Sequence, residues 1–213
     1  MRRNLLLPIL GLSLLTMFAC ANPADGVAEA EVAEPTAADS ANELEETAAV
    51  SLPLDDSSSI TWVGSKVTGS HDGGFKSFTG EVKLVDGDPT RSSVHLTIDT
   101  TTIWSDNDKL TGHLKSADFF EVDTYPEASF HSTTIQPAAD GGFEVTGDLT
   151  LHGVTKSITF PASITVADGT VSANAEFVLM RSDFGIVYPG KPDDLIRDEV
   201  VVRFDLQAAT PVG

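Results

Sequence analysis

The amino-acid sequence predicts an all-β domain in which eight antiparallel strands close into a barrel, with a short helical insertion between the third and fourth strands. Apolar and polar residues alternate in eight separate runs, the pattern of strands with one buried face. Clusters of glycine and aspartate, such as 86–88 and 140–142, separate the runs. Eight strands joined mostly by short turns favour closure into a barrel, because closure removes exposed strand edges.

The alternation places the strands in order along the chain. In the first run, Ile60 and Trp62 alternate with Ser59 and Thr61, and the last run contains Val200 and its apolar neighbours at every second position. Strands are predicted near residues 58–67, 75–86, 92–101, 127–136, 141–151, 155–167, 169–180 and 197–208.

Residues 105–121 interrupt this pattern. Ser105 is followed three residues later by Asp108, which resembles a capping box, and Ser116 could begin a second turn. One or two short helices are therefore predicted between strands three and four.

The first twenty residues have the features of an export signal. Arg2 and Arg3 precede an apolar stretch at residues 5–18, which is too short to span a bilayer as a helix. Cys20 is a candidate lipidated residue, so residues 1–20 predict a bacterial lipoprotein of the periplasm or cell envelope. The alternative is cleavage at an A-x-A site, at residues 19–21, to give a soluble exported protein.

Residues 21–57 are predicted to be a disordered acidic linker that precedes a single domain at 58–213. The linker holds ten acidic residues and no lysine or arginine, and it shows no apolar period. Such a segment buries too little apolar surface to offset its ordering entropy. It is interpreted either as a spacer from a membrane or as a solvated leader without a partner.

The composition excludes several classes of function. The net charge is −19, from 32 acidic and 13 basic residues, so no nucleic-acid partner is predicted. Electrostatic docking on anionic lipid is disfavoured for the same reason. Cys20 is the single cysteine, which rules out an intrachain disulfide and a cysteine-based zinc site.

Small residues on the apolar faces bear on the interior of the barrel. Gly147, Ala162, Ala173 and Ala175 lie in the middle of predicted strands, where a packed core would carry larger side chains. This pattern favours a hollow apolar lumen. The alternative is that neighbouring aromatic side chains fill these gaps. An eight-stranded barrel is either filled or holds one small ligand.

Three motifs in order give the domain a family resemblance. Gly112–Phe120, Tyr125–Phe130 and Thr146–Lys156 resemble the YceI family of lipid- and polyisoprenoid-binding proteins. Trp62–His71 is similar to the opening strand of one branch of that family, and Arg181–Ile186 to a closing element. The resemblance extends over about residues 58–208.

The resemblance implies a lipocalin-like barrel whose lumen holds a polyisoprenoid or an isoprenoid quinone. It implies export to the periplasm. Together with the hollow-barrel pattern, it predicts a carrier or storage role without a cofactor. Many members carry a His-Leu-Gly step after the first strand, where this chain has Lys66–Thr68 and, a little later, His71. The role of that histidine is therefore not transferred.

A long isoprenoid needs an apolar tube and a few polar groups at its mouth. Each buried CH₂ contributes about 0.8 kcal/mol. The alternative for every tube residue is an ordinary closed core. The predicted lumen residues are Leu96, Ile98, Phe130, Phe143, Val145, Leu149, Phe160, Phe177, Leu179, Val202 and Phe204.

Candidate residues for the mouth fall into two groups. Phe119 and Phe120 lie in the insertion and could form a lid, or simply anchor it on the sheet. Basic residues could bind a headgroup, whereas for His113 and Arg181 a hydrogen bond that fixes the loop is the favoured alternative. The predicted headgroup residues are Lys66, His71, His113 and Arg181.

Other functions have less support. The five histidines form no H-x-x-x-H pair, and no metal site is predicted. No nucleophile motif is present, and no catalytic residue is predicted. The alternatives to a lipid carrier are an enzyme acting on a lipid or quinone inside the barrel, and a structural envelope protein with a filled barrel. The pattern does not decide the oligomeric state.

Overall fold

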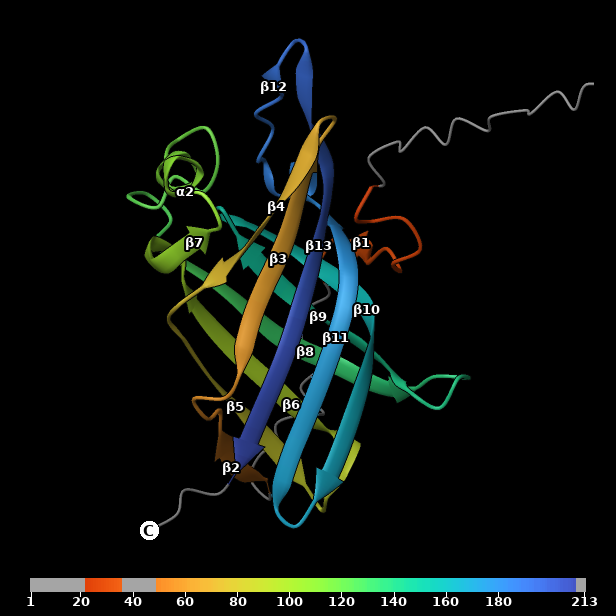
Figure 1. The fold of residues 1–213 in the computed structure, drawn as a ribbon. Coiled ribbons are helices and arrows are strands. Elements are labelled where there is room, and N and C mark those ends of the chain that lie inside the picture. Colours follow the sequence, from red (N-terminus) through yellow and green to blue (C-terminus); the bar gives the residue numbers. More distant parts are fainter. Residues whose placement is uncertain (1–21, 36–48, 210–213) are drawn as a thin grey trace, which may run out of the picture.

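The computed structural model describes residues 22–35 and 49–209, which form one curled antiparallel sheet of thirteen strands (Figure 1). The predicted signal and Cys20 lie outside the described residues. The strands are β1 (Glu31–Ala33), β2 (Val50–Pro53), β3 (Ser59–Lys66), β4 (Gly69–Phe75), β5 (Phe78–Val85), β6 (Asp88–Asp99), β7 (Ile103–Ser105), β8 (Glu127–Pro137), β9 (Phe143–Leu151), β10 (Val154–Ala167), β11 (Thr170–Met180), β12 (Gly190–Lys191) and β13 (Asp194–Ala209).

The prediction of an all-β domain is confirmed, but the predicted count of eight strands is wrong. The eight predicted strands correspond to β3, β5, β6, β8, β9, β10, β11 and β13. The five others have two to seven residues, most of them too short to establish a two-residue period; β4, the longest, is rich in glycine and polar residues. They form because the edges of longer strands supply hydrogen-bonding partners.

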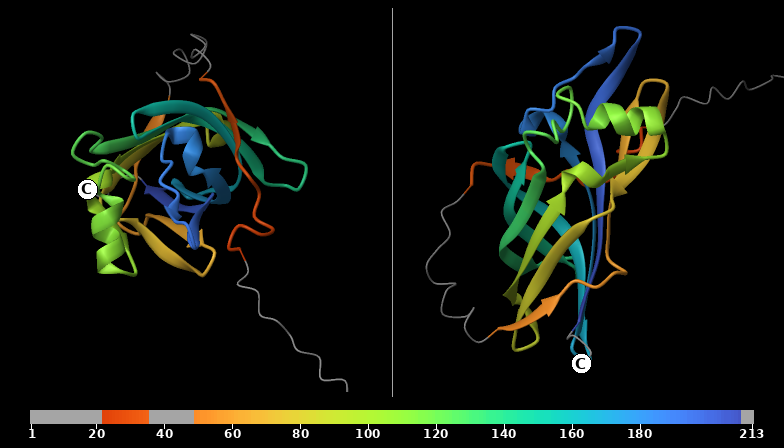
Figure 2. Two further views of the ribbon diagram at one scale, coloured as in Figure 1. Left: turned by 90° about the horizontal axis from the view of Figure 1, so that it is seen from above. Right: turned by 90° about the vertical axis from the view of Figure 1, so that its left-hand side faces the viewer.

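The sheet curls into a half-barrel in the order β2-β5-β6-β8-β9-β10-β11-β13-β3-β4-β7 (Figure 2). At its lower end, the segment after β2 links β5 to β13. Leu54 N–H donates to the Gly80 carbonyl, and Leu54 forms an antiparallel bridge with Ala208. The side chain of Leu52 is buried between these strands and is 1% exposed.

A second link lies in the upper half, where β10 and β11 separate. β10 pairs with β11 only from Ala162 onwards, next to Pro161, which has no N–H to donate. Residues 28–33 fill the gap. β1 pairs with β10, the Ala30 N–H donates to the Val178 carbonyl at 2.9 Å, and the Val178 N–H donates to the Ala28 carbonyl at 2.8 Å.

The prediction that residues 21–57 are disordered is therefore wrong for β1 and β2. These segments need no apolar pattern of their own, because open sheet edges satisfy their backbone groups. Ala30, which directly precedes β1, and Leu52 in β2 are also buried. Ala24 and Val27 further cover an apolar patch on the outside of the sheet, formed by residues 63, 178 and 201.

The insertion contains one helix of seven residues, α2 (Asp108–Leu114), and turns follow it. Its cap is Asn107, whose side chain accepts from Leu110 N–H at 3.0 Å. Ser105 instead donates its hydroxyl to the Asn107 carbonyl. Within residues 22–35 and 49–209, no helix is long and apolar enough to cross a membrane.

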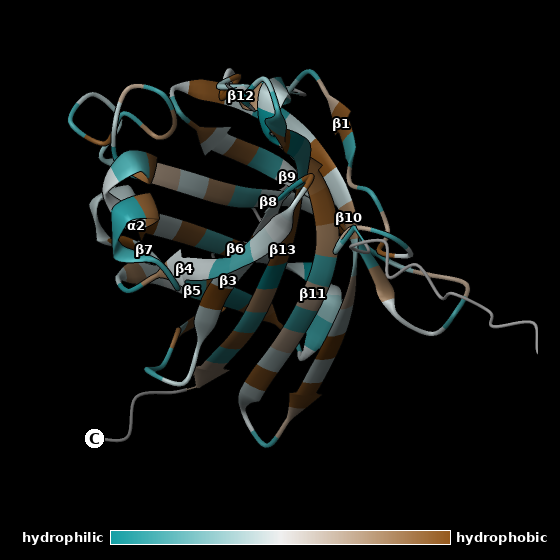
Figure 3. Ribbon diagram, turned by 45° about the horizontal axis from the view of Figure 1, so that its top comes forward, coloured by the Kyte–Doolittle hydropathy of each residue, from teal (hydrophilic) through white to brown (hydrophobic). Residues whose placement is uncertain are grey.

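The inward faces of the strands form the main core. Figure 3 shows apolar and polar bands alternating along the strands. In β9, for example, Val145 and Leu149 are buried on the inward face. Two 3₁₀ turns, Thr100–Thr102 and Arg181–Phe184, complete the fold, and Phe184 is fully buried.

Candidate functional site

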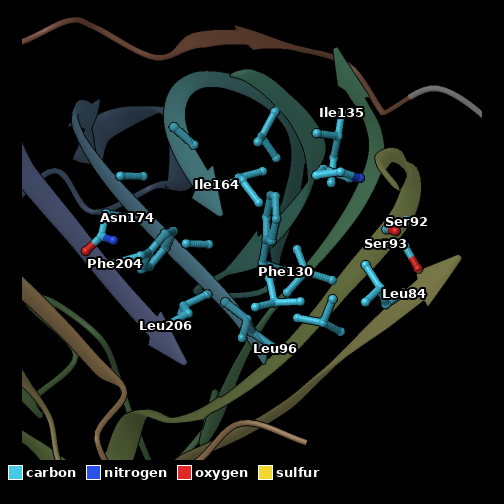
Figure 4. A pocket seen from close by; sticks show the side chains of 18 of the residues that line it. Leu84, Ser92, Ser93, Leu96, Phe130, Ile135, Ile164, Asn174, Phe204 and Leu206 are labelled. Carbon is cyan, nitrogen blue, oxygen red and sulfur yellow. The ribbon is translucent and has the colours of Figure 1, made fainter. Parts of the chain in front are cut away.

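Two cavities lie inside the barrel-like sheet. The upper cavity has a volume of about 330 Å³ and is lined by β3, β11, β13, α2 and the turn after α2. The lower cavity, shown in Figure 4, has a volume of about 60 Å³ and lies among β5, β6, β10, β11 and β13. The upper volume lies at the lower end of the range for small-molecule pockets, roughly 300–1,000 Å³.

A cluster of four phenylalanines lies where the two cavities meet. Phe160 and Phe177 are stacked with centroids 4.3 Å apart, and Phe204 meets both rings edge-on. Phe130 and Phe160 line the lower cavity, Phe177 lines the upper one, and Phe204 lines both. We call these four residues the aromatic partition.

Ten of the eleven predicted lumen residues line one of the two cavities. The lower cavity is lined by Leu96, Phe130, Val145, Phe160 and Phe204. The upper cavity is lined by Ile98, Leu149, Phe177, Leu179, Val202 and Phe204. Phe143 lines neither, because at the start of β9 it is partly exposed and packs against the edge of the core.

Both interpretations of the small residues hold in part. Ala162, Ala173 and Ala175 line the lower cavity. The space at Gly147 is filled by Phe130, since a Cβ there would lie 2.5 Å from the Phe130 ring. The interior therefore combines hollow regions with aromatic filling.

Three of the predicted headgroup residues line the upper cavity, and each contacts an aspartate. Lys66 forms an ion pair with Asp194, and His71 Nδ1 lies 2.7 Å from an oxygen of Asp106. The hydrogen bond from Lys66 holds the pKa of Asp194 below its ordinary value, and that with His71 lowers the pKa of Asp106. Both carboxylates therefore favour their charged forms at the mouth.

Arg181 has mainly backbone partners. Its Nε donates to the Arg197 carbonyl at 3.1 Å, and its Nη1 donates to the Ile186 carbonyl at 2.6 Å. Asp198 Oδ1 lies 3.9 Å from the same Nε. Burial lowers the pKa of Arg181, and Asp198 opposes that effect. Arg181 thus clamps the loop after β11 to the start of β13.

The insertion supplies apolar lining. Phe119 and Phe120 both line the upper cavity, and Phe119 is buried. His113 does not line it; its Nε2 contacts Asp118 at 2.8 Å, and its ring packs edge-on against Phe119 and Tyr188. His113 thus supports the insertion, which matches the alternative of a loop-fixing contact.

Three polar residues of the upper cavity were absent from the prediction. Trp62 Nε1, Ser65 Oγ and Arg197 Nε are buried atoms without a hydrogen-bond partner among the described residues. The inward position of Trp62 could have been predicted, because Trp62 alternates in phase with Ile60. That of Arg197 could not, because Arg197 lies on a bulge of β13 that breaks the two-residue period.

The sequence profile of the YceI-like domain matches residues 54–208 of this chain. The chain belongs to the YceI-like family. A UPF0312 protein of Pseudomonas putida is 38% identical over 138 residues, which cover 62% of this chain and 71% of that protein. Protein YceI of Escherichia coli is 39% identical over 92 residues, which cover 43% of this chain and 48% of that protein.

Solved structures show the same YceI-like fold. BcnA of Burkholderia cenocepacia superimposes with a TM-score of 0.67 at 27% identity, covering 73% of this chain and 99% of BcnA. A domain of Saccharophagus degradans, described as a polyisoprenoid-binding domain implicated in plant cell wall breakdown, gives a TM-score of 0.60. It is 20% identical, with 75% of this chain and 98% of that domain covered.

The motifs that resemble the YceI-like family adjoin the upper cavity. Gly112–Phe120 supplies part of its lining, and Thr146–Lys156 forms the hairpin of β9 and β10. The Tyr125 ring packs on His152, which lies in the turn of that hairpin, with ring centroids 4.7 Å apart. Gly153 has a φ of +73° and contacts the same ring, so a side chain there would be both strained and obstructed.

The described part of this YceI-like chain holds no group of three or more histidine, cysteine, aspartate or glutamate residues arranged to bind a metal ion. The carboxylates near the upper cavity instead contact basic side chains. Asp106, Asp194 and Asp198 contact His71, Lys66 and Arg181, respectively.

Proposed function

We propose that this YceI-like domain binds, carries or stores a long-chain isoprenoid-type lipid, either a polyisoprenoid or an isoprenoid quinone. The observation that carries the proposal is the upper cavity of about 330 Å³, lined largely by apolar side chains inside a curled sheet. The Saccharophagus degradans domain of the same fold, described as polyisoprenoid-binding, supports it.

The mechanism is partition into the cavity. Transfer of an isoprenoid chain from water to this apolar lining contributes about 0.8 kcal/mol per buried CH₂. Leu149, Leu179 and Val202 present aliphatic surface, and Phe119 and Phe120 cover one side. A chain without polar groups needs no specific partner there, so its length and shape govern affinity.

The place of action is also a proposal. Residues 1–20, with Cys20 as the lipidated residue, would direct the protein to the periplasm or cell envelope and hold it at a membrane. The domain would then take its lipid from that membrane, or return it there, without chemical change.

The test is native mass spectrometry of the full chain purified from a bacterial host, followed by solvent extraction and identification of bound molecules. A stoichiometric isoprenoid or quinone, released unchanged, is the expected result. A mass without bound lipid, together with no uptake of added farnesol or quinone, would refute the proposal. Conversion of the added lipid into a product would favour the enzyme alternative.

A further inference from the structure

Three unpartnered donors belong to residues that line the upper cavity: Trp62 and Ser65 on β3, and Arg197 on a bulge in β13. Ile196 pairs with Lys66 and Val200 pairs with Gly64, so three residues of β13 lie opposite the single residue Ser65. Bulges commonly redirect side chains at functional sites. Arg197 lies on this bulge and lines the cavity.

The three donors are unsatisfied within the described part of the chain. Ser65 is 7% exposed, and its hydroxyl has no partner. Trp62 Nε1 and Arg197 Nε are likewise buried without an acceptor. Most buried polar groups in folded proteins are hydrogen-bonded, and an unpaired one is costly. Three such donors around one cavity indicate an acceptor that a ligand supplies.

Among the described residues, Arg197 differs from the other basic residues of the upper cavity in its ion pairing. Lys66, His71 and Arg181 each have an aspartate within 4.0 Å. In the described residues, Arg197 forms no ion pair, and its Nε has no hydrogen-bond partner. The guanidinium is a strong, geometrically selective partner for carboxylate and phosphate oxygens.

We propose that Arg197, with Ser65 and Trp62, binds an anionic oxygen headgroup, a phosphate or a carboxylate, of the lipid whose chain lies in the upper cavity. This inference rests on the proposed lipid binding and adds the class of headgroup. It distinguishes an isoprenoid phosphate or acid from a neutral quinone or alcohol. The bulge positions the guanidinium, and the Arg181 hydrogen bond to the Arg197 carbonyl holds that backbone in place.

The headgroup preference is tested with the full chain and three probes that share one isoprenoid tail: farnesol, farnesyl monophosphate and farnesoic acid. Dissociation constants are measured by calorimetry at low and moderate salt. We expect the phosphate or the acid to bind at least about tenfold more tightly than farnesol, as a charge-assisted hydrogen bond would give. The tighter of the two anions identifies the headgroup.

Matched variants separate this site from the overall charge. Arg197→Gln should bring the affinity ratio of the anionic probes to farnesol down to about one, and Arg197→Lys should restore part of that ratio. Arg203→Gln is the control, because Arg203 lies on the same strand, outside the cavity lining, where it pairs with Glu176 at 2.7 Å. Unfolding temperatures verify that each variant folds.

The outcomes distinguish the two proposals. Equal affinity for all three probes, or an anion preference that survives in Arg197→Gln, would overturn the headgroup inference and leave lipid binding intact. Absence of binding for every probe would refute the proposed function itself. Loss of the anion preference in Arg203→Gln as well as in Arg197→Gln would show a general charge effect and would also overturn the inference.

Discussion

The two ends of the barrel interior differ although β6, β8, β9, β11 and β13 contribute to both. The upper cavity is about 330 Å³ and has four basic side chains in its lining, whereas the lower one is about 60 Å³ and is apolar except for a few residues such as Ser92 and Asn174. The difference arises from how side chains fill each end. The aromatic partition occupies the boundary between the two cavities. The alternation of residues along the strands defines the inward face, but the volume of the inward side chains decides where a cavity remains.

The largest expected effect comes from filling the upper cavity. A cavity of about 150 Å³ accommodates benzene, so the phenyl ring introduced by Ala128→Phe fits in the upper cavity. Because the ring occupies space that the lipid needs, it should raise the farnesol dissociation constant about 100-fold. Ala162→Phe is the matched change at the lower cavity, which is too small for the ring. It should cost about 1–3 kcal/mol of stability and leave affinity nearly unchanged.

Calorimetry and thermal unfolding measure the two effects side by side. An equal loss of affinity in both variants would contradict the assignment of the upper cavity as the lipid chamber.

The next effect concerns residues 28–33, which fill the gap between β10 and β11. Ala30 is 5% exposed in the core, so Ala30→Asp would bury an unpaired charge and release residues 28–33. We expect a loss of about 2 kcal/mol in unfolding free energy, since the hydrogen bonds to Val178 are lost as well. Denaturant unfolding measures this loss, and hydrogen exchange should show a less protected Val178 amide.

Ala33→Asp serves as the control for residues 28–33, because Ala33 lies three residues further on, in β1, and is exposed. If both substitutions have the same small effect, the packing of residues 28–33 contributes no stability.

A smaller effect concerns the aromatic partition. Phe204 lines both cavities, so Phe204→Ala should join them and admit a longer chain. The affinity ratio of geranylgeraniol to farnesol should rise about tenfold, as burial of about two further CH₂ groups would give. Competition binding measures the ratio. Val202→Ala, on the same strand but lining only the upper cavity, should leave it unchanged; an equal ratio in both variants would contradict a partition.

The smallest effect is the pH dependence of the stability that the ion pair of Lys66 and Asp194 contributes at the mouth of the upper cavity. Because the Asp194 pKa is lowered by Lys66, the stability from this pair is present above the ordinary aspartate pKa of about 3.9 and is lost as pH falls through the lowered value. Wild type should therefore exceed Asp194→Asn in stability at neutral pH, with the difference vanishing in acid. Asp193→Asn, exposed beside it, is the control. A difference that grows in acid would contradict the pairing.

The sequence predicted the long strands because burial of one face imposes a two-residue period along them. It missed β1 and β4 because edge pairing, and not an apolar pattern, holds them in place, and it missed β2 because the alternation of Val50 and Leu52 is only four residues long. Pairs such as Lys66 with Asp194, 128 residues apart, connect segments that no local pattern relates. Arg197 was missed because the bulge in β13 is set by pairing with β3 and breaks the period.

The most direct test of the account is isotope-filtered NMR of the full chain saturated with ¹³C-labelled farnesol. If the isoprenoid chain lies in the upper cavity, its methyl groups contact Ile98 and Leu179, which line that cavity, and not Ile164 and Leu206, which line the lower one. Contacts with the lower pair alone, or with neither pair despite saturation, would contradict that placement.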